Sequence, residues 1–88
     1  MDTRIAVVGS ILENPQESQE AFNATVAEFR HLVKARMGVP FEQKDLSVIS
    51  IIVEGALDEI NAFTGKLGRI SGVTSKTAIS GKQPGGAV

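Results

Sequence analysis

The sequence predicts an α+β fold of the ferredoxin-like type, in which two helices cover one face of a four-stranded antiparallel sheet. Segments 3–12 and 46–55 are rich in β-branched residues, and segments 15–30 and 56–71 carry apolar residues at helical spacing. The third observation is the order of the elements, which is β-α-β-β-α-β once two shorter strands are added.

The first strand is predicted over residues 3–12, "TRIAVVGSIL". Both of its alternating faces are apolar, which is typical of a strand that is covered on two sides. One face carries Ile5, Val7 and Ile11, and the other carries Ala6, Val8 and Leu12.

The first helix is predicted over residues 15–30. Asn14 is a residue type that caps helices through its side chain, and Pro15 suits the first helical position. Glu17 and Glu20 favour the positive end of the helix dipole. The apolar stripe consists of Phe22, Val26 and Phe29.

The segment after this helix is open to two interpretations. The helical stripe could continue through it, but residues 32–37 also alternate, and a Gly-x-Pro sequence then ends the segment. The polar run 42–45 is typical of a hairpin connection before the strand at 46–55, and a hairpin requires a first strand. We therefore predict a strand over residues 32–39.

The second helix is predicted over residues 56–71, with Phe63 at the edge of its apolar face. A last strand is predicted over residues 72–80, after a turn at Gly72. The apolar face of the helix comprises Leu57, Ile60, Thr64, Leu67 and Ile70.

The chain of 88 residues is predicted to form one domain over residues 1–80, followed by a flexible C-terminal tail at 81–88. A domain of this size buries only about 60–65% of the surface that its unfolded chain exposes, so it usually needs further stabilisation. The sequence has no cysteine, and His31 is its one histidine. Disulfides and a histidine or cysteine metal site within one chain are therefore excluded as sources of this stabilisation. Self-association remains, and strands with two apolar faces also predict it.

Charge and hydropathy argue against two classes of partner. The 9 basic and 10 acidic residues are spread along the chain, with no basic block for nucleic acid. No apolar run approaches the ~20 residues that span a membrane, and the N-terminus lacks the features of a secretory signal. We expect a cytoplasmic protein that binds neither nucleic acid nor membranes directly.

Residue types that perform catalysis are scarce. His31 falls at a junction between helix and strand, where a surface position or a dipole contact explains it. Asp58 and Glu59 open the second helix, where carboxylates are expected. The glycine-rich run at 65–72 ends a helix, whereas phosphate-binding loops begin one. We predict no catalytic residues, no metal and no cofactor.

Gly65 and Gly68 are unusual within a predicted helix, because each costs about 1 kcal/mol relative to alanine. Fraying and capping near the helix end would explain them. Close approach of a neighbouring subunit or a ligand would explain them equally, with Lys66 and Arg69 beside them on a solvated face or in contact with an anion.

Two stretches carry a resemblance to a known family: "RMGVPFEQKDLSVISIIVEG" at 36–55 and "TGKLGRISGVTSKTA" at 64–78. They resemble the iron-only hydrogenase system regulators, small bacterial proteins with an ACT-like ferredoxin fold. The fold is also similar to the C-terminal domain of nickel-responsive repressors. Those domains bind metal through several histidines and a cysteine, a set that this sequence does not have.

The resemblance implies a ligand site, because ACT-type domains bind small molecules at subunit interfaces near the loop after the first strand. Here that loop corresponds to the turn at 9–15. The ligand-binding residues expected there are Gly9, Ser10 and Asn14. Close approach to the second helix, argued above from its glycines, adds Gly65, Gly68 and Arg69 as expected ligand-binding residues.

Together with this resemblance, the sequence predicts a non-enzymatic regulatory or small-ligand-sensing domain that acts as a homodimer or homotetramer, with a small metabolite expected at the subunit interface. One alternative is an interaction module that docks on another protein without a ligand. The other is an enzyme that uses an open sheet face, as some ferredoxin-like dimers do.

Overall fold

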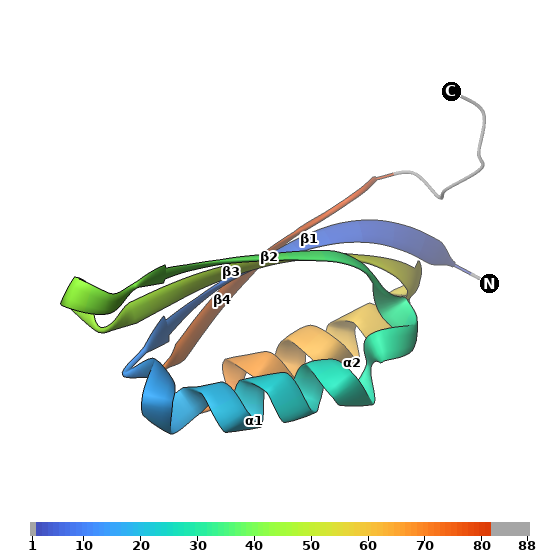
Figure 1. Cartoon of the computed structure of the whole chain (residues 1–88). Coiled ribbons are helices and arrows are strands. Elements are labelled where there is room, and N and C mark those ends of the chain that lie inside the picture. Colours follow the sequence, from blue (N-terminus) through green and yellow to red (C-terminus); the bar gives the residue numbers. More distant parts are fainter. Residues whose placement is uncertain (1, 82–88) are drawn as a thin grey trace.

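The structure, a computed structural model, describes residues 2–81. The predicted order of elements and the predicted ferredoxin-like fold are confirmed (Figure 1). Of the predicted tail, residues 82–88 lie outside the described part. The elements are β1 (Thr3–Glu13), α1 (Pro15–Glu28), η1 (Arg30–Leu32), β2 (Val33–Phe41), η2 (Glu42–Lys44), β3 (Leu46–Ala56), α2 (Leu57–Gly68) and β4 (Val73–Ile79), where η marks a single turn of 3-10 helix.

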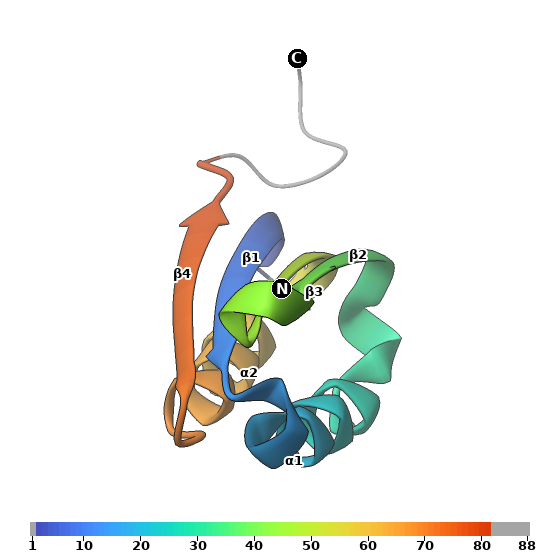
Figure 2. The ribbon, with the colours of Figure 1, turned by 60° about the vertical axis from the view of Figure 1, so that its left-hand side comes forward.

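The four strands form one antiparallel sheet in the order β2-β3-β1-β4. The two longest strands, β1 and β3, are central and pair over their whole length, from Thr3 opposite Ala56 to Glu13 opposite Leu46. Both helices pack on the same side of the sheet, as two views show (Figures 1 and 2). The other side of the sheet carries no element of the described chain, and we call it the open face.

The core lies between the helices and the sheet. Phe22 of α1 and Phe63 of α2 are completely buried, and the ring of Phe29 lies 5.3 Å from that of Phe63. The buried apolar residues are Ala6, Val8, Leu12, Phe22, Val26, Phe29, Leu32, Ile49, Ile51, Val53, Ile60, Phe63, Leu67 and Val73.

Helix α1 is shorter than predicted. It ends at Glu28 instead of residue 30, and Arg30–Leu32 form the 3-10 turn η1. This tighter turn buries Leu32 in the core and lets β2 begin at Val33. The prediction of a strand in this segment is confirmed, and the helical alternative is wrong.

Helix α2 differs from the prediction in its end and in its buried face. It ends at Gly68, and Gly72 has the left-handed φ of 82° that the turn into β4 requires. Ile70 then lies beyond the helix and is half-buried. Ile60 and Leu67 of the predicted apolar face are buried as expected, and Phe63, which was predicted at its edge, lies between them in the middle of the buried stripe.

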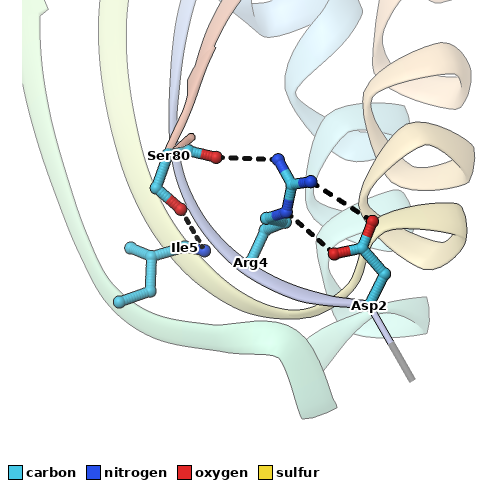
Figure 3. A network of polar contacts seen from close by, with 4 residues as sticks. All are labelled: Asp2, Arg4, Ile5 and Ser80. Atoms are coloured by element: carbon cyan, nitrogen blue, oxygen red, sulfur yellow. Dashed lines mark hydrogen bonds and ion pairs between the residues drawn. The ribbon is translucent and has the colours of Figure 1, made fainter. Parts of the chain in front are cut away.

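The start of β1 is tied to the end of β4 by polar contacts (Figure 3). The guanidinium of Arg4 donates to the backbone carbonyl of Ser80 at 2.9 Å and pairs with Asp2 at 2.9 Å. The backbone N–H of Ile5 donates to Ser80 Oγ at 3.2 Å. These contacts help to fix the register of the edge strand β4.

Within residues 2–81 no helix is both long and apolar enough to cross a membrane.

Candidate functional site

The open face is the most unusual surface of the described chain. Eight of its nine exposed large apolar side chains lie there, each with 37–66% of its area exposed. The ninth, Ile79, pairs with Ala6 on the opposite face. A contiguous apolar area of this kind usually marks an interface. The eight are Ile5, Val7 and Ile11 of β1, Met37, Val39 and Phe41 of β2, and Val48 and Ile52 of β3.

The strand register explains why these side chains share one face. Directly paired residues in an antiparallel sheet point to the same side. Val7 pairs with Ile52, and Ile11 pairs with Val48, so the exposed residues of β1 and β3 form apolar rows across the sheet. Their sequence neighbours point to the helices and are buried, which is why both faces of these strands are apolar.

A row of small and polar residues crosses the middle of the open face. Gly9 of β1 pairs with Ser50 of β3 on one side and with Lys76 of β4 on the other. Because Gly9 has no side chain, the surface is low between Ser50 and Lys76. Beside it lies an open groove of about 200 Å³, lined by Ala35, Arg36, Met37, Ser50 and Ile52.

The six predicted ligand-binding residues lie in separate places. Gly9 is in the middle of the open face, whereas its neighbour Ser10 is buried on the helix side and hydrogen-bonds Ser75 Oγ at 2.7 Å. The prediction that a turn begins at Gly9 is wrong, because β1 continues to Glu13. Strand β1 pairs with β3 over its whole length, and this pairing extends β1 past Gly9.

The predicted side-chain cap at Asn14 is also wrong. Asn14 precedes α1, but it has a left-handed φ of 52° and its side chain makes no cap hydrogen bond. Its backbone N–H donates to the carbonyl of Asp45, at 3.1 Å, and so joins the start of α1 to the β2–β3 turn. Asparagine is one of the few residue types that adopt this backbone conformation readily.

A second open groove, of about 410 Å³, lies at this junction between the start of α1 and the β2–β3 turn. Asn14 is not among its lining residues. They are Pro15, Gln16, Gln19, Pro40, Glu42, Asp45, Leu46 and Ser47.

Gly65, Gly68 and Arg69 lie together at the exposed end of α2, remote from the open face. A β-carbon added to Gly65 or Gly68 would meet no atom of the described chain within 4 Å. The space beside these glycines is therefore not needed for packing among residues 2–81. A role for these three residues, or for Gly9, Ser10 and Asn14, in binding a ligand stays a prediction.

Replacing Gly65 with alanine tests the two explanations of the helix glycines. If nothing approaches α2 in the assembled protein, Gly65→Ala should raise the free energy of unfolding by about 0.5–1 kcal/mol, because alanine loses less backbone entropy. Thermal unfolding and analytical ultracentrifugation of both proteins measure the effect. Lower stability together with weaker assembly would instead indicate a subunit or ligand at this helix.

Two polar side-chain contacts join the end of α1 and the turn η1 to α2. Lys66 pairs with Glu28 at 2.6 Å and lies 5.7 Å from the centre of the Phe29 ring. His31 Nε2 lies 2.5 Å from Glu59 Oε2. Lys66 is thus part of a contact between helices and not only of a solvated face. His31 is exposed, as predicted, but a carboxylate partner and not the helix dipole accounts for its position.

Within residues 2–81 no group of three or more His, Asp or Glu side chains is placed to hold a metal ion. We expect EDTA to leave the midpoint of thermal unfolding unchanged, because a structural metal would need several converging ligands. A fall of several degrees that one equivalent of nickel or zinc per chain reverses would contradict this. His31 from several subunits would then be the first candidate ligand.

The sequence matches one known family over residues 4–77, the TM1266-like family with the description "Iron-only hydrogenase system regulator, putative". The chain belongs to this family. The resemblance found in the sequence at 36–55 and 64–78 is thereby confirmed, and it extends through β1 and α1 as well. No curated protein matches the sequence significantly.

Solved structures agree with the membership in the TM1266-like family. The uncharacterized protein TM1266 from Thermotoga maritima superposes with a TM-score of 0.84 at 27% identity, over 88% of this chain and 96% of that one. SnoaB, a cofactor-independent oxygenase from Streptomyces nogalater, superposes with a TM-score of 0.56 at 18% identity, over 94% of this chain and 95% of that one. The second likeness shows a shared fold alone.

Sequence reasoning found Gly9, and it predicted the strand at 46–55 that contains Ser50. It missed Lys76 and Glu13 as residues of the open face. The period of two along β1 could have placed Glu13 on the face of Val7 and Ile11. Placing Lys76 beside Gly9 required the register of β4, which the sequence does not reveal.

Proposed function

We propose that this chain is a non-enzymatic regulatory domain that acts as a homo-oligomer, in which a second copy covers the open face and a small metabolite binds at the subunit interface. The observation that carries the proposal is the set of eight large apolar side chains on this face. Membership in a family described as regulators supports the regulatory part. The absence of cysteine from the sequence fits a cytoplasmic location, which we also propose.

A second copy is the occupant that the composition of the face favours. The apolar residues come from three strands and form a broad surface, which suits another sheet better than a narrow peptide. A sheet that packs on its own copy makes an isologous interface, the commonest kind in soluble oligomers. Such packing would also supply burial that a small domain without disulfides lacks.

The groove beside Ser50 supports the ligand part of the proposal. It opens on the same face, and a second subunit over that face would cover it. Its lining is mainly aliphatic, from Ala35, Met37 and Ile52, which suits a small molecule with an apolar body.

The proposal for non-enzymatic action rests on the side chains available. The sequence has no cysteine, tyrosine or tryptophan, and the one histidine pairs with Glu59 on the surface. Among residues 2–81 the polar groups of the open face are hydroxyls, lysines and carboxylates. Within these residues, none of its hydroxyls hydrogen-bonds a basic side chain that would activate it as a nucleophile.

Sedimentation equilibrium of the whole chain between about 1 and 100 µM tests the assembly. We expect a dimer or tetramer with native helix content. Native mass spectrometry of the same sample tests the ligand, since a bound metabolite would appear as an adduct of constant mass on the oligomer. A folded monomer throughout would overturn the proposed assembly, and an adduct-free oligomer would favour the interaction module.

A further inference from the structure

Two side chains of opposite charge stand out on the open face. Lys76 lies on β4 beside Gly9, and Glu13 lies at the end of β1 on the same face. Neither side chain has an ion-pair partner among residues 2–81, whereas Glu54, the other carboxylate of this face, lies 3.7 Å from Lys34.

These two charges cannot reach each other within one chain. Glu13 is four residues along β1 from Gly9, a separation of about 14 Å at the rise of an antiparallel strand. Lys76 pairs with Gly9, so the Lys76 side chain begins in the row of Gly9. This row and the row of Glu13 are separated by the same distance along the strands. The apolar row that contains Ile11 and Val48 lies between them.

A second copy can bring these charges together. In a face-to-face dimer whose two-fold axis crosses the strands at the row of Ile11, the row of Glu13 of one subunit lies over the row of Gly9 of the other. Since the interface is isologous, the contact occurs twice. The same arrangement places the apolar row of Ile11 and Val48 over its own copy. The overlap covers the five apolar residues nearest this axis, and Ile5, Val7 and Ile52 extend past the end of the partner's β1.

The surface around Gly9 has the right chemistry for a carboxylate. Gly9 leaves a gap, with the ammonium group of Lys76 on one side and the hydroxyl of Ser50 on the other. Both groups can donate hydrogen bonds to a carboxylate. A buried lysine without such a partner would oppose assembly, because desolvating an unpaired charge is costly.

We infer that the gap over Gly9 receives the carboxylate of Glu13 from a second copy of the chain, where it pairs with Lys76 and with Ser50, and that this reciprocal contact sets the register of the dimer. The inference rests on the proposed assembly through the open face. It adds which residues meet across that interface and predicts a single alignment of the two sheets.

Charge reversal with complementation tests this pairing. Lys76→Glu places two carboxylates in each contact, and Glu13→Lys places two ammonium groups there. We expect each variant alone to raise the Kd of the dimer by about tenfold or more, since like charges across an interface repel. An equimolar mixture contains two opposite-charge contacts per heterodimer, and we expect its Kd to return to within about threefold of the original.

The readout is sedimentation equilibrium for the Kd, together with native mass spectrometry in which one variant carries ¹⁵N so that heterodimers have their own mass. Arg30→Glu and Glu20→Lys make the same changes in net charge on exposed residues of the helix layer. We expect these controls to change the Kd by less than about twofold. A heterodimer of the neutral variants Lys76→Gln and Glu13→Gln has an opposite-charge contact at only one of its two positions. We therefore expect mixing them not to restore the Kd of the original chain.

Gly9→Ala supplies an independent measurement. An added β-carbon would approach the carbonyl oxygen of Lys76 at 3.9 Å, an ordinary contact, so the single chain should still fold. It would partly fill the gap, and we expect the Kd to rise by several-fold.

A dimer whose Kd is unaffected by the charge reversals, or a mixture without recovery, would overturn the pairing and leave the proposed assembly standing. A monomeric original protein would overturn both.

Discussion

Phe63→Ala is expected to lower the free energy of unfolding by about 3–5 kcal/mol, the range for removing a buried phenyl ring. Phe63 lies in the middle of the buried stripe of α2, is completely buried and packs against Phe29 at 5.3 Å. The loss combines transfer of the ring to water with the cavity that remains. Urea unfolding followed by circular dichroism, at several protein concentrations, measures it.

Phe41→Ala is the matched control, because it removes the same ring from the opposite side of the sheet. Phe41 is 43% exposed on the open face. We expect little loss of stability in the dissociated chain and weaker assembly in sedimentation equilibrium. Equal losses of stability from both substitutions, without any change in assembly, would contradict the division into a core face and an interface.

Ser50→Glu is expected to raise the Kd of the assembly by about a hundredfold or more while the single chain stays folded. Ser50 is half-buried in the single chain and faces solvent from the middle of the open face, so a carboxylate there can stay hydrated. A second sheet over this face would desolvate it, and in the inferred contact it would share Lys76 with the Glu13 carboxylate of the other copy. Burying two carboxylates against one lysine leaves a negative charge uncompensated, which costs several kcal/mol.

Ser71→Glu introduces the same carboxylate at an exposed position in the turn after α2, and it should leave the Kd unchanged. Circular dichroism establishes that both variants fold. If Ser50→Glu assembles as tightly as the original chain, the open face is not the interface. If it fails to fold at all, Met37→Glu, at the most exposed apolar residue of the same face, takes its place.

Much of the fold could be predicted from the sequence because its signals are local. The alternation in 46–55 and the helical spacing of Phe22, Val26 and Phe29 depend only on residues within one element. The structure confirms these elements, with boundaries that move by one to three residues. The order β-α-β-β-α-β then leaves few topologies, and the ferredoxin-like arrangement is one of them.

The candidate site was harder to predict because it depends on which strands lie side by side. Gly9 was predicted as a residue near the end of its strand, but pairing with β3 and β4 makes it the middle of a sheet face. Asn14 was predicted to cap a helix through its side chain. In the structure its backbone N–H instead donates to Asp45, a residue far along the chain. Asn14 has a left-handed backbone conformation there, and its side chain makes no cap hydrogen bond.

The sequence by itself determined the class of fold, the apolar character of both faces of the central strands and the family to which the chain belongs. Only the tertiary structure decided that Glu13 and Lys76 share the open face and that Gly9 leaves a gap between Ser50 and Lys76. The physical reason is that periodicity fixes the side of an element on which a residue lies. The register between strands, which long-range hydrogen bonds and core packing set together, fixes its neighbours.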